Sequence, residues 1–199
     1  MVTVRIATPG DAQGILDIYS PYILSTAFTF ESEVPSLPDF QLRIDNCLQR
    51  YPWLVCIVDG LLAGYAYASA HRERTAYQWS CECSVYVQEN FRGRRLGKEL
   101  YAALFQVLKL QGLRNVYAGI TLPNDPSISL HEGCGFEHFA TYEHVGYKLG
   151  SWQKVGWWRL LINDLEKEPA PPIKFSQMNL RLLTEIVTAA AQKIHLQFT

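Results

Sequence analysis

The sequence of 199 residues has no excess of either charge, because 18 lysines and arginines stand against 19 acidic residues, for a net charge of −1. Near-neutrality argues against the general electrostatic attraction that draws a protein to nucleic acid or to an anionic membrane. No apolar run reaches the roughly 18 residues that a transmembrane helix needs. The first residues, MVTVRIATPGDAQG, also lack the basic and apolar regions of a signal peptide. We therefore expect a cytoplasmic protein with no nucleic-acid and no membrane partner.

Cysteine pairs of the kind that build disulfide frameworks or zinc sites are missing. The cysteines are five, an odd number, and no two of them are spaced as CxxC. They are Cys47, Cys56, Cys81, Cys83 and Cys134. This pattern is typical of reduced thiols in a cytosolic protein. The sequence predicts no metal site.

Hydrophobic residues make up 48% of the chain and aromatic residues 13%, which is enough to bury one sizeable core. Apolar periodicity predicts strands at residues 2–7, 53–58, 61–70, 77–87, 114–122, 136–150 and 155–162. It predicts helices after Asp11, over 36–51, after residue 98 and over 125–135. This mixed order indicates one α/β domain with a mixed sheet, of α+β type, over residues 1–165.

A separate segment follows at residues 166–199. Its first part, EKEPAPPIKF, is charged and rich in proline, which is the composition of a linker. Beyond it, apolar residues recur at helical spacing from Leu183 to Ile194. We expect this helix to dock on its own domain or on a second subunit.

Positive charge is concentrated in one short stretch, ENFRGRRLGKEL, between a predicted strand and a predicted helix. The first N–H groups of a helix are unpaired and its dipole favours anions, so a glycine-containing loop at this point can bind phosphate. The glycine spacing does not fit GxGxxG, and no serine or threonine follows Lys98 as in a Walker motif. The stretch therefore predicts a site for a pyrophosphate of nucleotide type.

The order of strand, cationic glycine loop, helix, strand and short helix resembles the acetyl-CoA site of the GNAT acyltransferase family, whose loop reads Q/R-x-x-G-x-G/A. The segments VRIATPGDAQGILDIY, WSCECSVYV, LPNDPSISLHEGCGF and GYKLG, with VGWW after it, resemble the phosphinothricin N-acetyltransferase branch over residues 2–165. The resemblance implies a GNAT-like acetyl-CoA-binding fold with an extra C-terminal helix. It also implies a homodimer.

Acetyl-CoA binding is implied for three groups of residues. They are Val85, Tyr86 and Val87 in the strand; Arg92, Gly93, Arg94, Arg95, Leu96, Gly97 and Lys98 in the loop; and Asn124 and Ser127 at the next helix start. The strand residues should offer backbone N–H and C=O groups to the pantetheine arm and the thioester oxygen. Arg95 stands where the family has its first glycine, and a left-handed backbone there would cost about 1–2 kcal/mol. Asn124 and Ser127 also suit ordinary helix capping.

Acyl transfer to an amine needs a base that takes a proton, a group that stabilises the oxyanion, and an acid for the thiolate. Glu82 alternates with apolar residues in its strand, so its side chain lies on a different face from the core. Periodicity alone is equally consistent with a carboxylate paired to an arginine, but the resemblance implies the catalytic base. His131 lies where many family members place the tyrosine that protonates the thiolate, although a lone histidine is usually structural.

The binding site for the acceptor amine is indicated by HRERTAY. In this stretch, Arg72, Arg74 and Tyr77 come just before the strand that carries Glu82. Arginine forks suit carboxylate or phosphinate oxygens, and solvated loop charge is the alternative. Phe28 and Phe30 should form an apolar wall of the same pocket, and the resemblance adds Tyr147 and Trp152. Core packing is the alternative for these aromatic residues.

Three functions are consistent with these features. The first is N-acetylation of a small amino acid-like amine, of the phosphinothricin, methionine sulfoximine or methionine sulfone type. The second is acetylation of a protein N-terminus or a polyamine, and the arginines weigh against polyamines because like charges repel. The third is a non-catalytic acyl-CoA-binding module, against which the presence of Glu82 and of the NDPS and LHE stretches argues.

Overall fold

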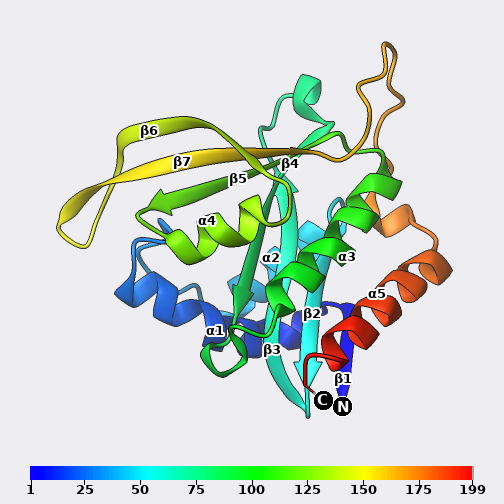
Figure 1. Cartoon of the computed structure of the whole chain (residues 1–199), viewed down its shortest axis with the longest axis horizontal. Coiled ribbons are helices and arrows are strands. Elements are labelled where there is room, and N and C mark those ends of the chain that lie inside the picture. The colour runs from blue at the N-terminus through cyan, green and yellow to red at the C-terminus, as the bar shows by residue number, and fades with distance from the viewer. Residues whose placement is uncertain (199) are drawn as a thin grey trace.

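Seven strands form one mixed sheet in the order β1-β2-β3-β4-β5-β7-β6 in the computed structural model, which describes residues 1–198 (Figure 1). The strands are β1 (Val2–Ile6), β2 (Trp53–Val58), β3 (Leu61–Ala70), β4 (Ser80–Val87), β5 (Asn115–Leu122), β6 (Glu137–Lys148) and β7 (Ser151–Leu161). The helices are α1 (Ala12–Ser25), α2 (Leu37–Leu48), α3 (Leu96–Gln111), α4 (Asp125–Glu132) and α5 (Leu180–His195). The predicted mixed α/β sheet is confirmed.

Local sequence explains most of these boundaries. Asp59 and Gly60 have positive φ values of 50° and 83°, and they form the tight turn between β2 and β3. The Ser36 side chain accepts a hydrogen bond from the N–H of Asp39 and caps α2. β4 begins at Ser80, three residues later than predicted, because Thr75–Tyr77 forms a 3₁₀ turn.

The turn between the last two strands is shorter than the sequence predicts. β7 begins at Ser151, and not at residue 155, because Leu149 and Gly150 turn the chain with φ values of 52° and 78°. β6 and β7 then extend beyond the rest of the sheet as a long ribbon (Figure 1). Much of β6 is exposed as a result.

The helices cover both faces of the sheet. α3 packs on β2, β3 and β4, and its Leu100, Leu104 and Leu108 are fully buried in the larger core. α1 and α2 cover the opposite face, where Ile15 and Ile44 pack in a second core. Burying this apolar surface on both faces fixes which side of each strand faces which helices.

β4 and β5 are the only parallel neighbours among the paired strands of residues 1–198, and they pair over three positions, Ser80–Glu82 with Asn115–Tyr117. Their outer partners hold them much longer, because β3 pairs with β4 through Val87 and β7 pairs with β5 through Leu122. The two strands therefore separate after Glu82.

α5 docks on its own domain, which is one of the two arrangements expected from the sequence. It packs on β1 and α3, and Leu183, Val187, Ala190 and Ile194 are buried there. Beyond it, the ring of Phe198 lies 6.1 Å from that of Phe91 and 4.8 Å below the guanidinium of Arg94. The terminal segment thus reaches the cationic loop.

Ile194 supplies a test of this docking, because its side chain is fully buried against the main core. Ile194→Ala should lower the free energy of unfolding by about 2–5 kcal/mol through lost burial and a cavity. Leu180→Ala in the same helix is the control: Leu180 is 73% exposed, so its loss should cost within about 0.5 kcal/mol. Urea unfolding measures both, and equal costs would show that α5 is not docked in solution.

Candidate active site

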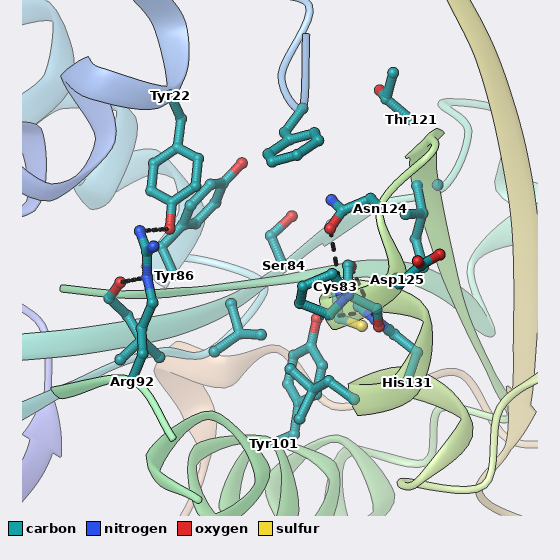
Figure 2. A pocket seen from close by; sticks show the side chains of 18 of the residues that line it. Tyr22, Cys83, Ser84, Tyr86, Arg92, Tyr101, Thr121, Asn124, Asp125 and His131 are labelled. Atoms are coloured by element: carbon teal, nitrogen blue, oxygen red, sulfur yellow. Dashed lines mark hydrogen bonds between the residues drawn. The ribbon is translucent and has the colours of Figure 1, made fainter. Parts of the chain in front are cut away.

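A cavity of about 560 Å³ occupies the gap where β4 and β5 separate. This volume falls within the range of small-molecule sites. Residues from both faces of the sheet line it: Tyr22, Phe28, Ser84 and Tyr86 on the α1 side, and Cys83, Val85, Tyr101, Leu130 and His131 on the α3 and α4 side. Figure 2 shows Tyr22 and Arg92 at one end and Asn124, Asp125 and His131 at the other. A ligand in this cavity can therefore be approached from both faces.

The β4 backbone presents alternate residues to the gap. The N–H of Gln88 donates to the carbonyl of Ala63, which fixes the ladder between β3 and β4 at that position. Antiparallel alternation then directs the backbone groups of Val85 and Val87 away from β3 and toward the gap. Tyr86, between them, pairs its backbone with β3 and contributes its ring to the cavity.

The Tyr86 ring belongs to an aromatic cluster on the α1 side. It packs against Tyr19 at 5.0 Å, Tyr22 at 5.1 Å and Tyr65 at 5.2 Å between ring centroids. Burial raises the pKa of Tyr86 well above its usual value, so its phenol stays neutral. This cluster forms a rigid apolar wall.

The cationic loop places the start of α3 beside the cavity. Gly93 has φ 75°, and Arg95 adopts the left-handed conformation at φ 55° and ψ 6°. The strain anticipated for a non-glycine residue at 95 is therefore present. No side chain caps the first N–H groups of α3, which leaves them available to an anion. Leu96 and Gly97 are buried in this first turn.

Among the loop cations, Arg92 is the one that lines the cavity. It donates to the Tyr22 hydroxyl at 2.9 Å and, through Nε, to the Val87 carbonyl at 3.4 Å. Arg94 lies over Phe198, Arg95 is exposed and Lys98 is half-buried in the first turn of α3. The four cations thus surround the start of α3, and they do not form one cluster in the cavity.

The opposite wall is the start of α4. Asn124 caps this helix, because its side-chain oxygen accepts from the N–H of Ser127 at 3.3 Å. Both residues also line the cavity. The capping role that the sequence allowed is therefore present together with a position suitable for ligand contact.

His131 is 5% exposed, and both of its ring nitrogens have partners. Nδ1 donates to the Ser127 carbonyl at 2.7 Å, which makes Nε2 the acceptor of the Tyr101 hydroxyl at 3.0 Å. Burial lowers the pKa of His131 below its usual value. The ring is consequently neutral at neutral pH, with its one N–H committed to the backbone.

Glu82 lies at the point where the two strands separate, next to Cys83 of the cavity wall. Its Oε1 is 2.9 Å from Nδ1 of His71 and 3.4 Å from a guanidinium nitrogen of Arg72. The side chain is 30% exposed on the face opposite the buried Cys81 and Cys83. The expected difference in face is confirmed.

Of the residues expected to bind the acceptor, Phe28 lines the cavity, whereas Arg72, Arg74 and Tyr77 lie outside its lining. Tyr77 packs edge-on against His71 at 6.0 Å. Arg74 is exposed at the start of the turn that carries Tyr77, whereas Arg72 is bonded to Glu82 and to the carbonyl of His71.

Three other aromatic residues lie outside the cavity lining. Phe30 packs against Gly146 of β6 so closely that a Cβ at position 146 would clash with the ring. Tyr147 and Trp152 pack on each other near the tip of the β6–β7 hairpin and are 64% and 61% exposed. None of these three side chains therefore lines the cavity in the structure.

Several site residues escaped the sequence analysis. Tyr22, Ser84 and Tyr101 line the cavity, but each looks like an ordinary helix or strand residue in sequence. His71 begins the HRERTAY stretch, in which the sequence pointed to the arginines and Tyr77. Only the register of β3 and β4 in the structure reveals the place of His71, since Ser69 pairs with Glu82 and the end of β3 lies beside the carboxylate.

Residues 1–198 contain no group of three or more histidine, cysteine or acidic side chains placed to hold a metal ion. Within the same residues, no helix has the length and apolar character needed to cross a membrane.

Comparison with known families identifies the class. Residues 4–157 match the acetyltransferase (GNAT) domain, and the chain belongs to this family. It is therefore an acetyltransferase, and the predicted family and fold are confirmed.

Among individual relatives, the chain is 39% identical to phosphinothricin N-acetyltransferase of Streptomyces viridochromogenes, over 86% of this chain and 91% of the relative. It is 32% identical to L-methionine sulfoximine/L-methionine sulfone acetyltransferase of Pseudomonas paraeruginosa, over 84% of this chain and 98% of the relative. A solved phosphinothricin acetyltransferase from Sinorhizobium meliloti, in complex with acetyl-CoA, superposes with a TM-score of 0.79. That structure is 30% identical and covers 87% of this chain and 98% of its own.

The neutral state of His131 predicts a pH dependence of stability. The unfolded chain protonates this ring near pH 6.5, whereas the folded chain protonates it only at lower pH. The unfolded state therefore binds more protons as pH falls below about 6.5, and the stabilisation is lost progressively down to the folded pKa. Above about pH 7.5 it is fully present.

His131→Gln removes this titration. The difference in unfolding free energy between wild type and variant should be constant between about pH 7.5 and 8.5 and should shrink at pH 5, as measured by urea unfolding at each pH. A difference that grows as the pH falls would show that folding raises the pKa of His131.

Proposed function

We propose that the protein transfers the acetyl group of acetyl-CoA to the amine of a small amino acid-like acceptor, of the phosphinothricin or methionine sulfoximine and sulfone type. The observation that carries this proposal is the cavity between β4 and β5, which is lined from both faces of the sheet. The donor can occupy the α3 and α4 side and the acceptor the α1 side. The printed activities of the relatives support this acceptor class.

The residues present fit acetyl-CoA. Uncapped N–H groups at the start of α3, with the cations from Arg92 to Lys98 around them, suit a pyrophosphate. The backbone of Val85 and Val87 faces the gap and suits the amides of the pantetheine arm. Asn124 and Ser127 form the opposite wall. Bound there, acetyl-CoA supplies an acyl group activated as a thioester.

We assign Glu82 as the general base. The amine of an amino acid is mostly protonated at neutral pH, and only the free amine can attack a carbonyl. Glu82 is the acidic residue of β4 at the point where the strands separate. It takes one proton from the ammonium group, directly or through water, and the N–H electron pair stays on nitrogen for the attack.

Charge that develops on the thioester oxygen is stabilised by the N–H groups of the β4 backbone at Val85 and Val87. For the departing thiolate, we assign the Tyr101 hydroxyl as the proton donor: its O–H bond breaks, an S–H bond forms, and the phenolate takes a proton back from solvent. His131 orients this hydroxyl, because Nε2 accepts a hydrogen bond from it at 3.0 Å and the ring's own N–H is bonded to the Ser127 carbonyl. Both residues line the cavity.

Arg74 is assigned to the acceptor anion, together with Tyr77 and the apolar wall of Phe28. Arg72 lies beside it but already contacts Glu82. We assign Phe30 and Tyr147 to the outer part of this pocket.

We further propose a cytoplasmic homodimer in which residues 1–165 carry catalysis and 166–199 stabilise the domain. Sedimentation equilibrium, which reads mass directly, tests the dimer.

The acceptor class is tested by thiol release from acetyl-CoA with phosphinothricin, methionine sulfone, polyamines and short peptides as acceptors. The small anionic amines should give the highest kcat/KM. Arg74→Ala should raise KM for methionine sulfone about 10-fold or more, since a charge-assisted hydrogen bond is lost. The amide of methionine sulfone is the matched control and should lose far less; equal losses would remove the anion-binding role.

Glu82→Gln tests the base. The amide keeps the shape of the side chain and cannot accept the proton, so kcat should fall about 10²–10⁴-fold at pH 7. KM for acetyl-CoA should change little, and part of the activity should return at high pH, where solution supplies free amine. Glu73→Gln, an exposed substitution of the same kind nearby, should retain wild-type kcat. Near-native activity of the Glu82 variant at pH 7 would make Glu82 a structural carboxylate.

A further inference from the structure

The two carboxylate oxygens of Glu82 have different surroundings. Oε1 lies 2.9 Å from Nδ1 of His71 and 3.4 Å from a guanidinium nitrogen of Arg72. Within residues 1–198, no hydrogen bond or ion pair falls on Oε2. One oxygen is therefore anchored, and the other is left available.

His71 is itself held in place by aromatic rings from three elements. Its imidazole stacks on Tyr117 with 4.4 Å between centroids and 20° between planes. Tyr77 and Trp157 pack edge-on against it at 6.0 Å and 6.1 Å. The side chain is only 15% exposed. Contacts on a face and at two edges leave the ring little freedom to rotate.

This arrangement is built at the point where β4 and β5 separate. Tyr117 is the β5 residue that pairs with Glu82 itself, in the last pair before the gap. Trp157 is paired with Gly119 of β5, which lines the cavity. The rings that hold His71 therefore come from strand positions at the edge of the cavity.

A general base is effective only when its lone pair is held at the right place, since a misplacement of about 1 Å can cost 100-fold in rate. A glutamate side chain has three rotatable bonds, and the exposed fraction of Glu82, 30%, leaves room for several rotamers. A hydrogen bond from a fixed imidazole removes most of that freedom.

We propose that His71 is a positioning residue that fixes the Glu82 carboxylate through Oε1, so that Oε2 is the atom that takes the proton. This inference rests on the proposed function, in which Glu82 is the base. When the ammonium N–H bond breaks, an O–H bond forms at Oε2 and the electron pair remains on the amine nitrogen. Nδ1 of His71 donates to Oε1 throughout and does not enter the proton transfer.

Two substitutions separate the hydrogen bond from the aromatic packing. His71→Asn places an amide N–H near the position of Nδ1 but removes the stacked ring. His71→Phe keeps a ring between Tyr117, Tyr77 and Trp157 but removes the donor. We expect His71→Phe to lower kcat for methionine sulfone acetylation about 10-fold to 100-fold, with KM for acetyl-CoA unchanged. His71→Asn should retain most of kcat.

A role in packing alone predicts the opposite order, with the phenylalanine variant active and the asparagine variant impaired. His138→Phe is the matched control, because His138 also packs on a tryptophan, at 4.7 Å from Trp158, but has no contact with Glu82. It should keep wild-type kcat. Melting temperatures of all variants check that each is folded.

The double variant Glu82→Gln with His71→Phe completes the test. If His71 acts through Glu82, the second substitution should lower kcat no further than Glu82→Gln alone. Additive losses, or a fully active His71→Phe enzyme beside an inactive Glu82→Gln enzyme, overturn the positioning role and leave the base assignment standing. Full activity of Glu82→Gln overturns both, so the two failures are distinguishable.

Discussion

The separation of β4 and β5 after three residue pairs is the constraint on which the rest of the structure depends. Each strand is held along its other edge by a long antiparallel ladder, with β3 on one side and β7 on the other. Those ladders keep both strands hydrogen-bonded along their outer edges while the gap between them widens. Backbone groups that would otherwise pair across the gap become available to a ligand at Val85 and at the Val87 N–H, whereas the Val87 carbonyl accepts from Arg92.

The gap also divides the chemistry of the site between the two faces of the sheet. Side chains alternate along a strand, so Cys83 and Val85 face α3 whereas Glu82, Ser84 and Tyr86 face α1. The helix start lies on the first side, where we propose that the phosphate-bearing donor binds. The carboxylate and the aromatic wall lie on the second side, where we propose that the amine binds. In this proposal, one strand brings donor and acceptor together from opposite directions.

The terminal segment, which lies beyond the matched family domain, packs on the same core and loop. α5 covers β1 and α3, and the segment before it is fastened by hydrogen bonds such as that from the Ile173 N–H to the Gln111 carbonyl at 2.8 Å. Phe198 packs on Phe91 and below Arg94, at the base of the cationic loop. The terminal segment that adds apolar burial to the core through α5 therefore also contacts the cationic loop, through Phe198.

The sequence by itself determined the sheet-and-helix order, the cationic loop and the position of Glu82, because periodicity, turn residues and local motifs act over a few neighbouring residues. The resemblance to the family's loop, which has a glycine where Arg95 stands, also implied strain there if the backbone were left-handed, and the φ of Arg95 is 55°. Only the tertiary structure decided which side chains meet. His71 and Glu82 are 11 residues apart, and Tyr101 and His131 are 30 apart. Their contacts follow from strand register and helix packing, which depend on burial over the whole sheet and leave no local pattern in the sequence.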